Sequence, residues 1–234
     1  MACAAADKPV DHVSTRRHDV TADVQALRDR LSHVYWIGGA SAAGKSTITR
    51  RVAAEHGLRT YATDDVMPDH ARRSTAEDCP LLHNFMAMTM DERWVNRSPR
   101  QMLETFHWFR GEGFSLIIED LLTFSRDTGV VADGFRLLPH LVKPLLADLN
   151  HVVWLIPTPE FRKSVIDGRG GPAWEFIART GEPDRALRNL LERDAMFTER
   201  LEEEAQRLDM NIIQVNSTVT EDEVAGRVAE LFGL

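Results

Sequence analysis

One short segment, GASAAGKST at residues 39–47, restricts the fold more than any other part of the chain. A continuous apolar run, VYWI at residues 34–37, precedes it, and a helical pattern follows over residues 45–56. A continuous apolar run indicates a strand that is covered on both faces. Gly57 suits the left-handed conformation that commonly ends a helix. The sequence therefore predicts a buried strand, a tight turn and a helix in direct succession.

The turn itself has the spacing of a P-loop, with two glycines separated by four residues and then Lys and Ser. The glycines would bring backbone N–H groups close to phosphate oxygens, and the helix N-terminus would face the same anion. Lys45 would neutralise the outer phosphates, and the hydroxyl of Ser46 would join a magnesium shell. We therefore expect ATP and Mg²⁺ as cofactors. The predicted nucleotide-binding residues are Gly39, Ala40, Ser41, Ala42, Ala43, Gly44, Lys45, Ser46 and Thr47.

Along the rest of the chain, apolar runs alternate with helical patterns, which favours an α/β fold with a mainly parallel sheet. Besides the first strand, the predicted strands cover residues 58–62, 129–132, 151–156 and 211–215. The predicted helices include residues 21–32 with Thr21 as cap, a helix opened by Pro139, a long helix over residues 184–208, and a final helix that starts in a capping box of Thr220 and Glu223.

The segment between the second and third strands allows two interpretations. Residues 66–97 are irregular or form short helices. From the cap Ser98, apolar residues spaced by three or four predict one helix that runs to about Phe124. The alternative breaks this helix at residues 111–113 and makes residues 114–118 a strand. Periodicity alone does not decide between them.

Together with the P-loop, an acidic pair after the second strand and an Arg-rich segment after a later strand give the chain a family resemblance. It resembles the P-loop small-molecule and nucleoside kinases, nearest to the uridine, gluconate and shikimate kinase and chloramphenicol phosphotransferase group. The resemblance covers roughly residues 33–232. It implies an α/β three-layer sandwich with a five-stranded parallel sheet in the order 2-3-1-4-5. It also implies one kinase domain over residues 21–234, with a helical acceptor-binding insert at 66–125 and a lid at 159–193.

In that family an acidic residue at the end of the second strand faces the acceptor hydroxyl. Asp64 and Asp65 occupy this position, and we favour a catalytic role for them over helix capping. Adjacent residues of a strand point to opposite faces, so both need not reach the site. A third acidic residue would end strand three and help to hold the metal with Ser46. We prefer Asp133 for this place, and the alternative is a strand that ends in Glu119 and Asp120.

The lid region is rich in arginine, whose planar fork suits phosphate oxygens. Arg169, in a GRGG turn, and Arg193, on the following helix, are the two catalytic candidates. The other arginines of this region are expected to be mostly solvated charges: Arg162, Arg179, Arg185 and Arg188. Polar and aromatic residues of the insert could shape an acceptor pocket or serve packing: His70, Arg72, Arg73, His83, Asn84, Trp94, His107 and Trp108.

Charge and composition narrow the class of partner. The formal net charge of −8 argues against a general nucleic-acid binder, which usually needs a basic face. No apolar run approaches the roughly 20 residues needed to cross a bilayer. We expect a cytoplasmic protein, a monomer or homodimer, with a disordered leader over residues 1–20.

These features predict an ATP-dependent kinase that transfers the γ-phosphate to a hydroxyl of a small molecule such as a nucleoside, a sugar-like metabolite or an antibiotic. The alternative is a nucleotide-binding regulatory protein with slow hydrolysis of the triphosphate. The sequence contains neither an NKxD motif of GTPase switches nor an LSGGQ signature of transporter subunits. It does not identify the acceptor.

Overall fold

A computed structural model describes residues 23–234. Five strands form one all-parallel sheet in the order β2-β3-β1-β4-β5. The order confirms the predicted fold class of a doubly covered α/β sheet. The strands are β1 (Val34–Gly39), β2 (Arg59–Ala62), β3 (Val130–Asp133), β4 (Val152–Pro157) and β5 (Ile212–Val215).

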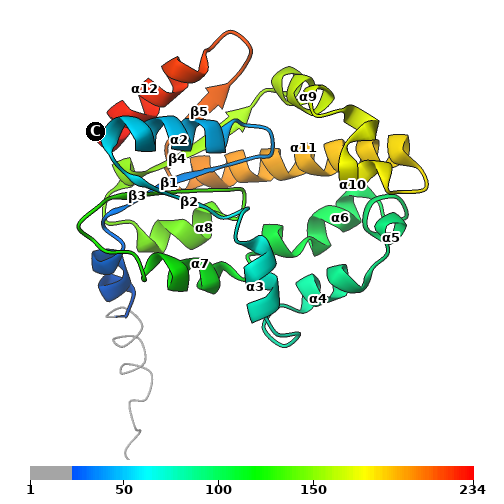
Figure 1. The fold of residues 1–234 in the computed structure, drawn as a ribbon, viewed down its shortest axis with the longest axis horizontal. Coiled ribbons are helices and arrows are strands. Elements are labelled where there is room, and N and C mark those ends of the chain that lie inside the picture. Colours follow the sequence, from blue (N-terminus) through cyan, green and yellow to red (C-terminus); the bar gives the residue numbers. More distant parts are fainter. Residues whose placement is uncertain (1–22) are drawn as a thin grey trace, which may run out of the picture.

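Helices cover both faces of the sheet because successive strand residues point to opposite sides. On one face, Ile37 and its neighbours pack against α2 (Lys45–His56) and α12 (Glu221–Phe232). On the other face, Trp36 belongs to a larger core that includes residues of α7 (Phe114–Leu121), α8 (Pro139–Val142) and α11 (Pro183–Arg207). Figure 1 shows α2 and α12 above the sheet and α7 and α8 below it.

The register brings three loops to one edge of the sheet. Asp133 of β3 pairs with Ile37 of β1 on one side and with Ala62 of β2 on the other. The carboxyl ends of these parallel strands therefore lie next to each other. In open α/β sheets, ligands bind at this edge. The segments that follow β1 and β2 carry the P-loop and the acidic pair of Asp64 and Asp65, and Asp133 ends β3 beside them.

Between β2 and β3 the chain forms a helical insert. Its helices are α3 (Met67–Arg73), α4 (Pro80–Ala87), α5 (Met90–Trp94), α6 (Pro99–Thr105), the 3-10 helix η1 (His107–Arg110) and α7. The predicted single helix from Ser98 to about Phe124 is wrong. Gly111 and Gly113 both have positive φ, 81° and 72°, and each stands at a helix boundary. The predicted alternative is also wrong about the strand, because residues 114–118 are helical.

After β4 the chain forms α9 (Pro159–Gly168), the 3-10 helix η4 (Gly171–Ala173), α10 (Glu175–Ala178) and the long α11. Two further 3-10 turns, η2 (Lys143–Leu145) and η3 (Leu149–His151), precede β4. The capping box of Thr220 and Glu223 is present at α12, as predicted. Residues 23–30 are helical, whereas the predicted Thr21 cap and the predicted leader over residues 1–20 lie outside the described residues.

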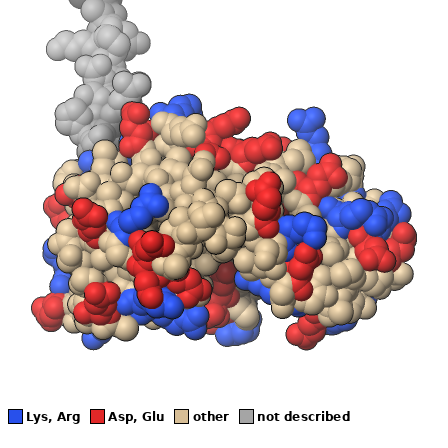
Figure 2. Space-filling view, turned by 90° about the horizontal axis from the view of Figure 1, so that it is seen from above, with Lys and Arg blue, Asp and Glu red and all other residues tan. Residues whose placement is uncertain are grey.

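The described surface carries charges of both signs. On the face shown in Figure 2, Lys and Arg side chains alternate with Asp and Glu side chains, and no continuous basic field covers the described part of that face. Within residues 23–234, no helix combines the length and the apolar character that a bilayer crossing requires.

Candidate functional site

The P-loop follows β1 in a tight turn that only small residues can form. Gly39 has φ +139°, and a Cβ at this position would lie 2.2 Å from the carbonyl oxygen of Leu155 on β4. Gly44 is the N-cap of α2 in the left-handed conformation. Ala42 also has a positive φ, 62°, which is uncommon for a residue with a side chain. Such a sequence of conformations turns backbone N–H groups inward and forms a concavity that suits anions.

Lys45 begins α2 and is buried against this loop. Its Nζ donates a hydrogen bond to the carbonyl oxygen of Ala40 at 2.7 Å, and its exposed fraction is only 8%. Burial lowers the pKa of the ammonium group, and the carboxylates of Asp64 and Asp133 oppose that shift. The ammonium therefore lies beside the P-loop turn, with two carboxylates nearby.

Asp133 ends β3 beside the P-loop, as the preferred interpretation of the sequence predicted. Its Oδ1 accepts a hydrogen bond from the hydroxyl of Ser46 at 3.0 Å. The carboxyl group is 3% exposed, and burial raises its pKa, while Ser46 and Lys45 lower it. The pair of Ser46 and Asp133 thus presents oxygen ligands of the kind that Mg²⁺ prefers.

This pair alone offers only two side chains with oxygen ligands. Within residues 23–234, no group of three or more His, Cys, Asp or Glu side chains could hold a metal ion. Mg²⁺ commonly takes only one or two protein ligands and completes its shell with phosphate oxygens and water. The residues present therefore fit an ion that binds together with a triphosphate.

The two acidic residues after β2 differ in position. Both residues are exposed, but only Asp64 lines the cavity in front of the P-loop. Surrounding protein raises the pKa of Asp64 through desolvation, and Lys45 and Arg136 oppose the shift. The two acidic candidates therefore differ in whether they reach the cavity.

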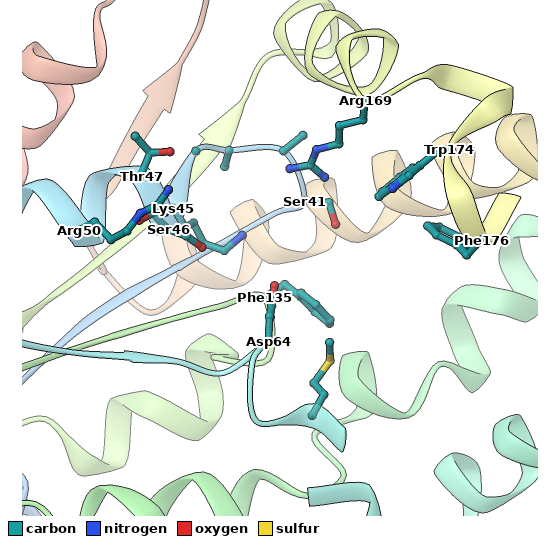
Figure 3. A pocket seen from close by; sticks show the side chains of 14 residues that line it. Ser41, Lys45, Ser46, Thr47, Arg50, Asp64, Phe135, Arg169, Trp174 and Phe176 are labelled. Atoms are coloured by element: carbon teal, nitrogen blue, oxygen red, sulfur yellow. The ribbon is translucent and has the colours of Figure 1, made fainter. Parts of the chain in front are cut away.

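The cavity has a volume of about 500 Å³ and opens to solvent. The P-loop forms one side, and segments after β2, β3 and α9 form the others (Figure 3). Figure 3 shows Asp64 and Phe135 facing the P-loop from below. The lining residues are Ser41, Ala42, Ala43, Gly44, Lys45, Ser46, Thr47, Arg50, Asp64, Met67, Phe135, Arg169, Trp174 and Phe176.

The segment predicted to be a lid contributes three of these residues. Arg169 is the C-cap residue of α9, and its guanidinium carbon lies 5.4 Å from the centre of the Trp174 ring. Its positive charge is close enough to Lys45 to help lower the pKa of that lysine. Trp174 and Phe176 flank the start of α10 and also border the cavity. A cation from this segment therefore lines the same cavity as the P-loop, and a catalytic role for Arg169 stays a prediction.

Arg193 is placed differently from what the sequence suggested. It is 5% exposed and does not line the cavity. Its Nε and one terminal nitrogen donate to Oδ1 of Asp194 at 2.9 Å and 2.6 Å. The guanidinium lies over the rings of Phe106 and Phe109, at 4.6 Å and 5.0 Å. In this arrangement Arg193 is a buried cation held by aromatic rings and a neighbouring carboxylate.

A buried network behind Asp64 escaped the sequence analysis. Arg136, which is 2% exposed, donates to the carbonyl oxygens of Thr63 and Gly113, each at 3.2 Å, and to Nδ1 of His70 at 2.9 Å. Nε2 of His70 then contacts Oδ2 of Asp120 at 2.7 Å. Because Nδ1 accepts from the guanidinium, Nε2 carries the proton and donates it to Asp120. The network joins the turn that carries Asp64 to the insert.

Asp120 does not end a strand, although the alternative interpretation of the sequence placed it at the end of strand three. It lies in α7 and accepts hydrogen bonds from Tyr61, at 2.8 Å, and from Arg73, at 2.7 Å. These hydrogen bonds help to lower its pKa.

Of the insert residues that the sequence offered for an acceptor pocket, none lines the described cavity.

The apolar cavity residues Met67, Phe135, Trp174 and Phe176 were also missed, as was Arg50. Phe135 could have been found, because it follows the Asp133-Gly134 step directly and so lies at the carboxyl edge of the sheet. Nothing in the sequence distinguishes Trp174 and Phe176 from packing residues, because their place depends on how η4 and α10 turn back over the P-loop.

The chain was compared with known proteins at three levels. It matches no protein-family model, and no curated protein matches its sequence. Among solved structures, an uncharacterized protein from Eubacterium ventriosum is similar over 86% of this chain and 97% of its own, with a TM-score of 0.45 and 12% identity.

Two similar structures are kinases. Deoxyadenosine kinase from M. mycoides, solved with bound dATP, has a TM-score of 0.43 and 13% identity over 86% of this chain and 100% of its own. Shikimate kinase from Acinetobacter baumannii, solved with shikimate, has a TM-score of 0.38 and 16% identity over 89% of this chain and 96% of its own.

Proposed function

We propose that this protein is an ATP-dependent phosphotransferase that moves the γ-phosphoryl group of ATP to a hydroxyl of a small molecule. One observation carries the proposal. The P-loop with Lys45 and a separate carboxylate, Asp64, line the same cavity of about 500 Å³. A phosphate-binding loop and a group that can receive a hydroxyl proton are the two parts that this reaction needs.

In the proposed reaction, the bond between the γ-phosphorus and its bridging oxygen breaks, and ADP leaves. A new bond joins that phosphorus to the acceptor oxygen, and the hydroxyl proton passes to Asp64. The desolvation that raises the pKa of Asp64 favours this transfer, because a more basic carboxylate accepts a proton more readily. Lys45 and Arg169 offset the negative charge of the transferring group.

Magnesium would be held by Ser46 and Asp133 together with the phosphates, and it would supply charge neutralisation at the β- and γ-phosphate oxygens. Ser41 and the aromatic residues on the far side of the cavity would reduce the access of water to the transferring group. Residues 159–193 would serve as a lid, since Arg169, Trp174 and Phe176 reach the cavity from this segment.

The proposal is tested by incubating the purified protein with ATP, Mg²⁺ and a library of nucleosides, sugars, sugar acids and antibiotics. Mass spectrometry then seeks a compound that gains a phosphate, and ADP release is measured in parallel. We expect at least one compound to gain a phosphate and to stimulate ADP release. Slow ADP release that no compound stimulates would contradict the proposal and indicate a regulatory nucleotide-binding protein.

A matched pair of variants tests the role of Asp64. Asp64→Asn should lower kcat at least about 100-fold, as expected for loss of a general base, with a smaller effect on ATP affinity. Asp65→Asn is the control, because Asp65 lies next in the chain and outside the cavity, and its kcat should stay within about twofold. Steady-state kinetics with the acceptor found above provide the measurement. Equal losses in the two variants would exclude the assignment.

A further inference from the structure

We infer that the acceptor carries a flat, uncharged aromatic or heteroaromatic ring, which binds between Phe135 on one side of the cavity and Trp174 with Phe176 on the other. The inference rests on the proposed function and names the substrate class of the same site. Its grounds are the aromatic lining of the cavity and the distribution of charge around it.

The aromatic residues come to the cavity from two separate parts of the fold. Phe135 follows β3, and Trp174 and Phe176 flank the start of α10. Figure 3 shows Phe135 beside Asp64 below the P-loop, and the other two rings to the right of both, with Arg169 between Trp174 and the P-loop. All three side chains line the same cavity. A ligand next to Asp64 is therefore also next to flat apolar surface.

Aromatic contacts hold each of these three rings in position. Phe109 contacts Phe135 edge-on, with ring centres 5.8 Å apart. Trp94 contacts Phe176 with ring centres 5.2 Å apart, and Trp174 meets Phe176 edge-on at 4.6 Å. Rings that are fixed by neighbours lose little conformational freedom when a ligand stacks on them. Preorganised aromatic surface of this kind binds flat rings well, because stacking adds to apolar burial.

The charged residues around the cavity argue for an uncharged ligand at this end. Three cations line the cavity, and Lys45 and Arg50 belong to the P-loop helix α2. The third, Arg169, lies near Lys45 and would meet phosphate oxygens there. Among residues 23–234, Asp64 is the only acidic residue in the lining. A polycationic acceptor would meet a single carboxylate in this cavity, which is too little negative charge to pair with it. An anionic acceptor would compete with ATP for the same cations.

The test uses uridine, adenosine and chloramphenicol as ring-bearing probes, and gluconate, shikimate and kanamycin as probes without a flat ring. Binding is measured by calorimetry in the presence of Mg²⁺ and a non-hydrolysable ATP analogue, and transfer is measured separately with ATP. We expect at least one ring-bearing probe to bind with a dissociation constant at least about tenfold lower than those of all the ring-free probes, because only a flat ring can stack on the aromatic side chains.

Two variants of one residue test whether the ring is bound by stacking. Trp174→Leu keeps an apolar side chain but removes the flat ring, and it should weaken the ring-bearing probe at least about fivefold. Trp174→Phe keeps a flat ring, and it should stay within about threefold of the unchanged protein. Thermal unfolding of both variants checks that the fold is intact.

The outcomes separate this inference from the proposed function. Ring-selective binding that Trp174→Leu weakens supports the inference, even if no probe gains a phosphate, which would count against the kinase proposal alone. Transfer to gluconate, shikimate or kanamycin as efficient as transfer to the ring-bearing probes would support the kinase and overturn the inference. Failure of all three ring-bearing probes to bind, or equal effects of the two variants, would also overturn it.

Discussion

At the scale of single residues, Arg136 shows how a buried charge can hold a turn of the chain in place. Its guanidinium binds the carbonyl oxygen of Thr63, the residue immediately before Asp64. It also lies 4.0 Å from the centre of the Trp108 ring, and burial lowers its pKa to about 10. Gly134 adds to this restraint, because a Cβ there would lie 1.7 Å from Oγ1 of Thr63. The turn that carries Asp64 is thus fixed from two sides.

Arg136→Met should destabilise the protein by about 3–5 kcal/mol, because it leaves two carbonyl oxygens and Nδ1 of His70 buried without their donor. Urea unfolding followed by circular dichroism measures the change. Arg72→Met is the control, since the Arg72 side chain is 70% exposed and pairs with Asp69, and it should change stability by less than about 0.5 kcal/mol. A loss below about 1 kcal/mol in Arg136→Met would contradict this account.

At the scale of elements, the left-handed glycines explain why the insert differs from its sequence pattern. Apolar spacing continues from Ser98 through Leu121, but Gly111 and Gly113 break the chain into α6, η1 and α7. Gly113 is the N-cap of α7 with φ +72°, and a Cβ there would approach Trp108 to 3.2 Å and Arg136 to 3.3 Å. This glycine is therefore needed both for its backbone conformation and for the space it leaves.

Two substitutions to alanine should consequently act in opposite directions. Gly113→Ala should cost about 1–2 kcal/mol, because alanine is strained at positive φ and meets close neighbours. Gly226→Ala should stabilise by about 0.5–1 kcal/mol, because Gly226 lies within α12 and a Cβ there has nothing within 4 Å. Thermal or urea unfolding compares the two. A change in the free energy of unfolding with the same sign in both variants would contradict the strain assigned to Gly113.

The sequence predicted those elements whose pattern depends on local contacts. The strand before the P-loop and the helix after it follow from one apolar run and one glycine-lysine turn, and Asp133 follows from the next buried strand. The choice between Asp64 and Asp65 depended on a turn that Arg136 fixes from a distant segment. The aromatic side of the cavity depends on how α10 folds back, which no local spacing encodes.

At the scale of the whole molecule, buried histidines make stability depend on pH. His107 is 2% exposed, and desolvation together with the charges of Arg136, Arg193 and Arg93 lowers its pKa to about 3. Burial also lowers the pKa of His70. An unfolded histidine has a pKa of about 6.5, so the unfolded chain binds more protons below that value. The contribution of these neutral histidines to the free energy of unfolding is therefore fully present above pH 6.5 and is lost progressively as the pH decreases below it.

The contribution of His107 can be measured by replacing it with phenylalanine. Between pH 7 and pH 5 the unchanged protein should lose about 2 kcal/mol more stability than His107→Phe, which corresponds to one blocked protonation over about 1.5 pH units. Asp64 and Asp133, whose raised pKa values act in the opposite sense, contribute to both proteins alike. His140→Asn is the control for loss of a partly exposed histidine. Parallel stability curves for His107→Phe and the unchanged protein would contradict the assignment.

The central claim is that the turn at residues 39–47 binds the triphosphate of ATP with magnesium. Calorimetric titration with ATP and Mg²⁺ tests it on the unchanged protein, on Lys45→Ala and on Lys163→Ala, whose lysine pairs with Asp167 at the surface. We predict binding that weakens at least about tenfold in Lys45→Ala, through loss of a charge-assisted contact, and stays unchanged in Lys163→Ala. The absence of measurable binding, or equal affinities in the unchanged protein and Lys45→Ala, would contradict the claim.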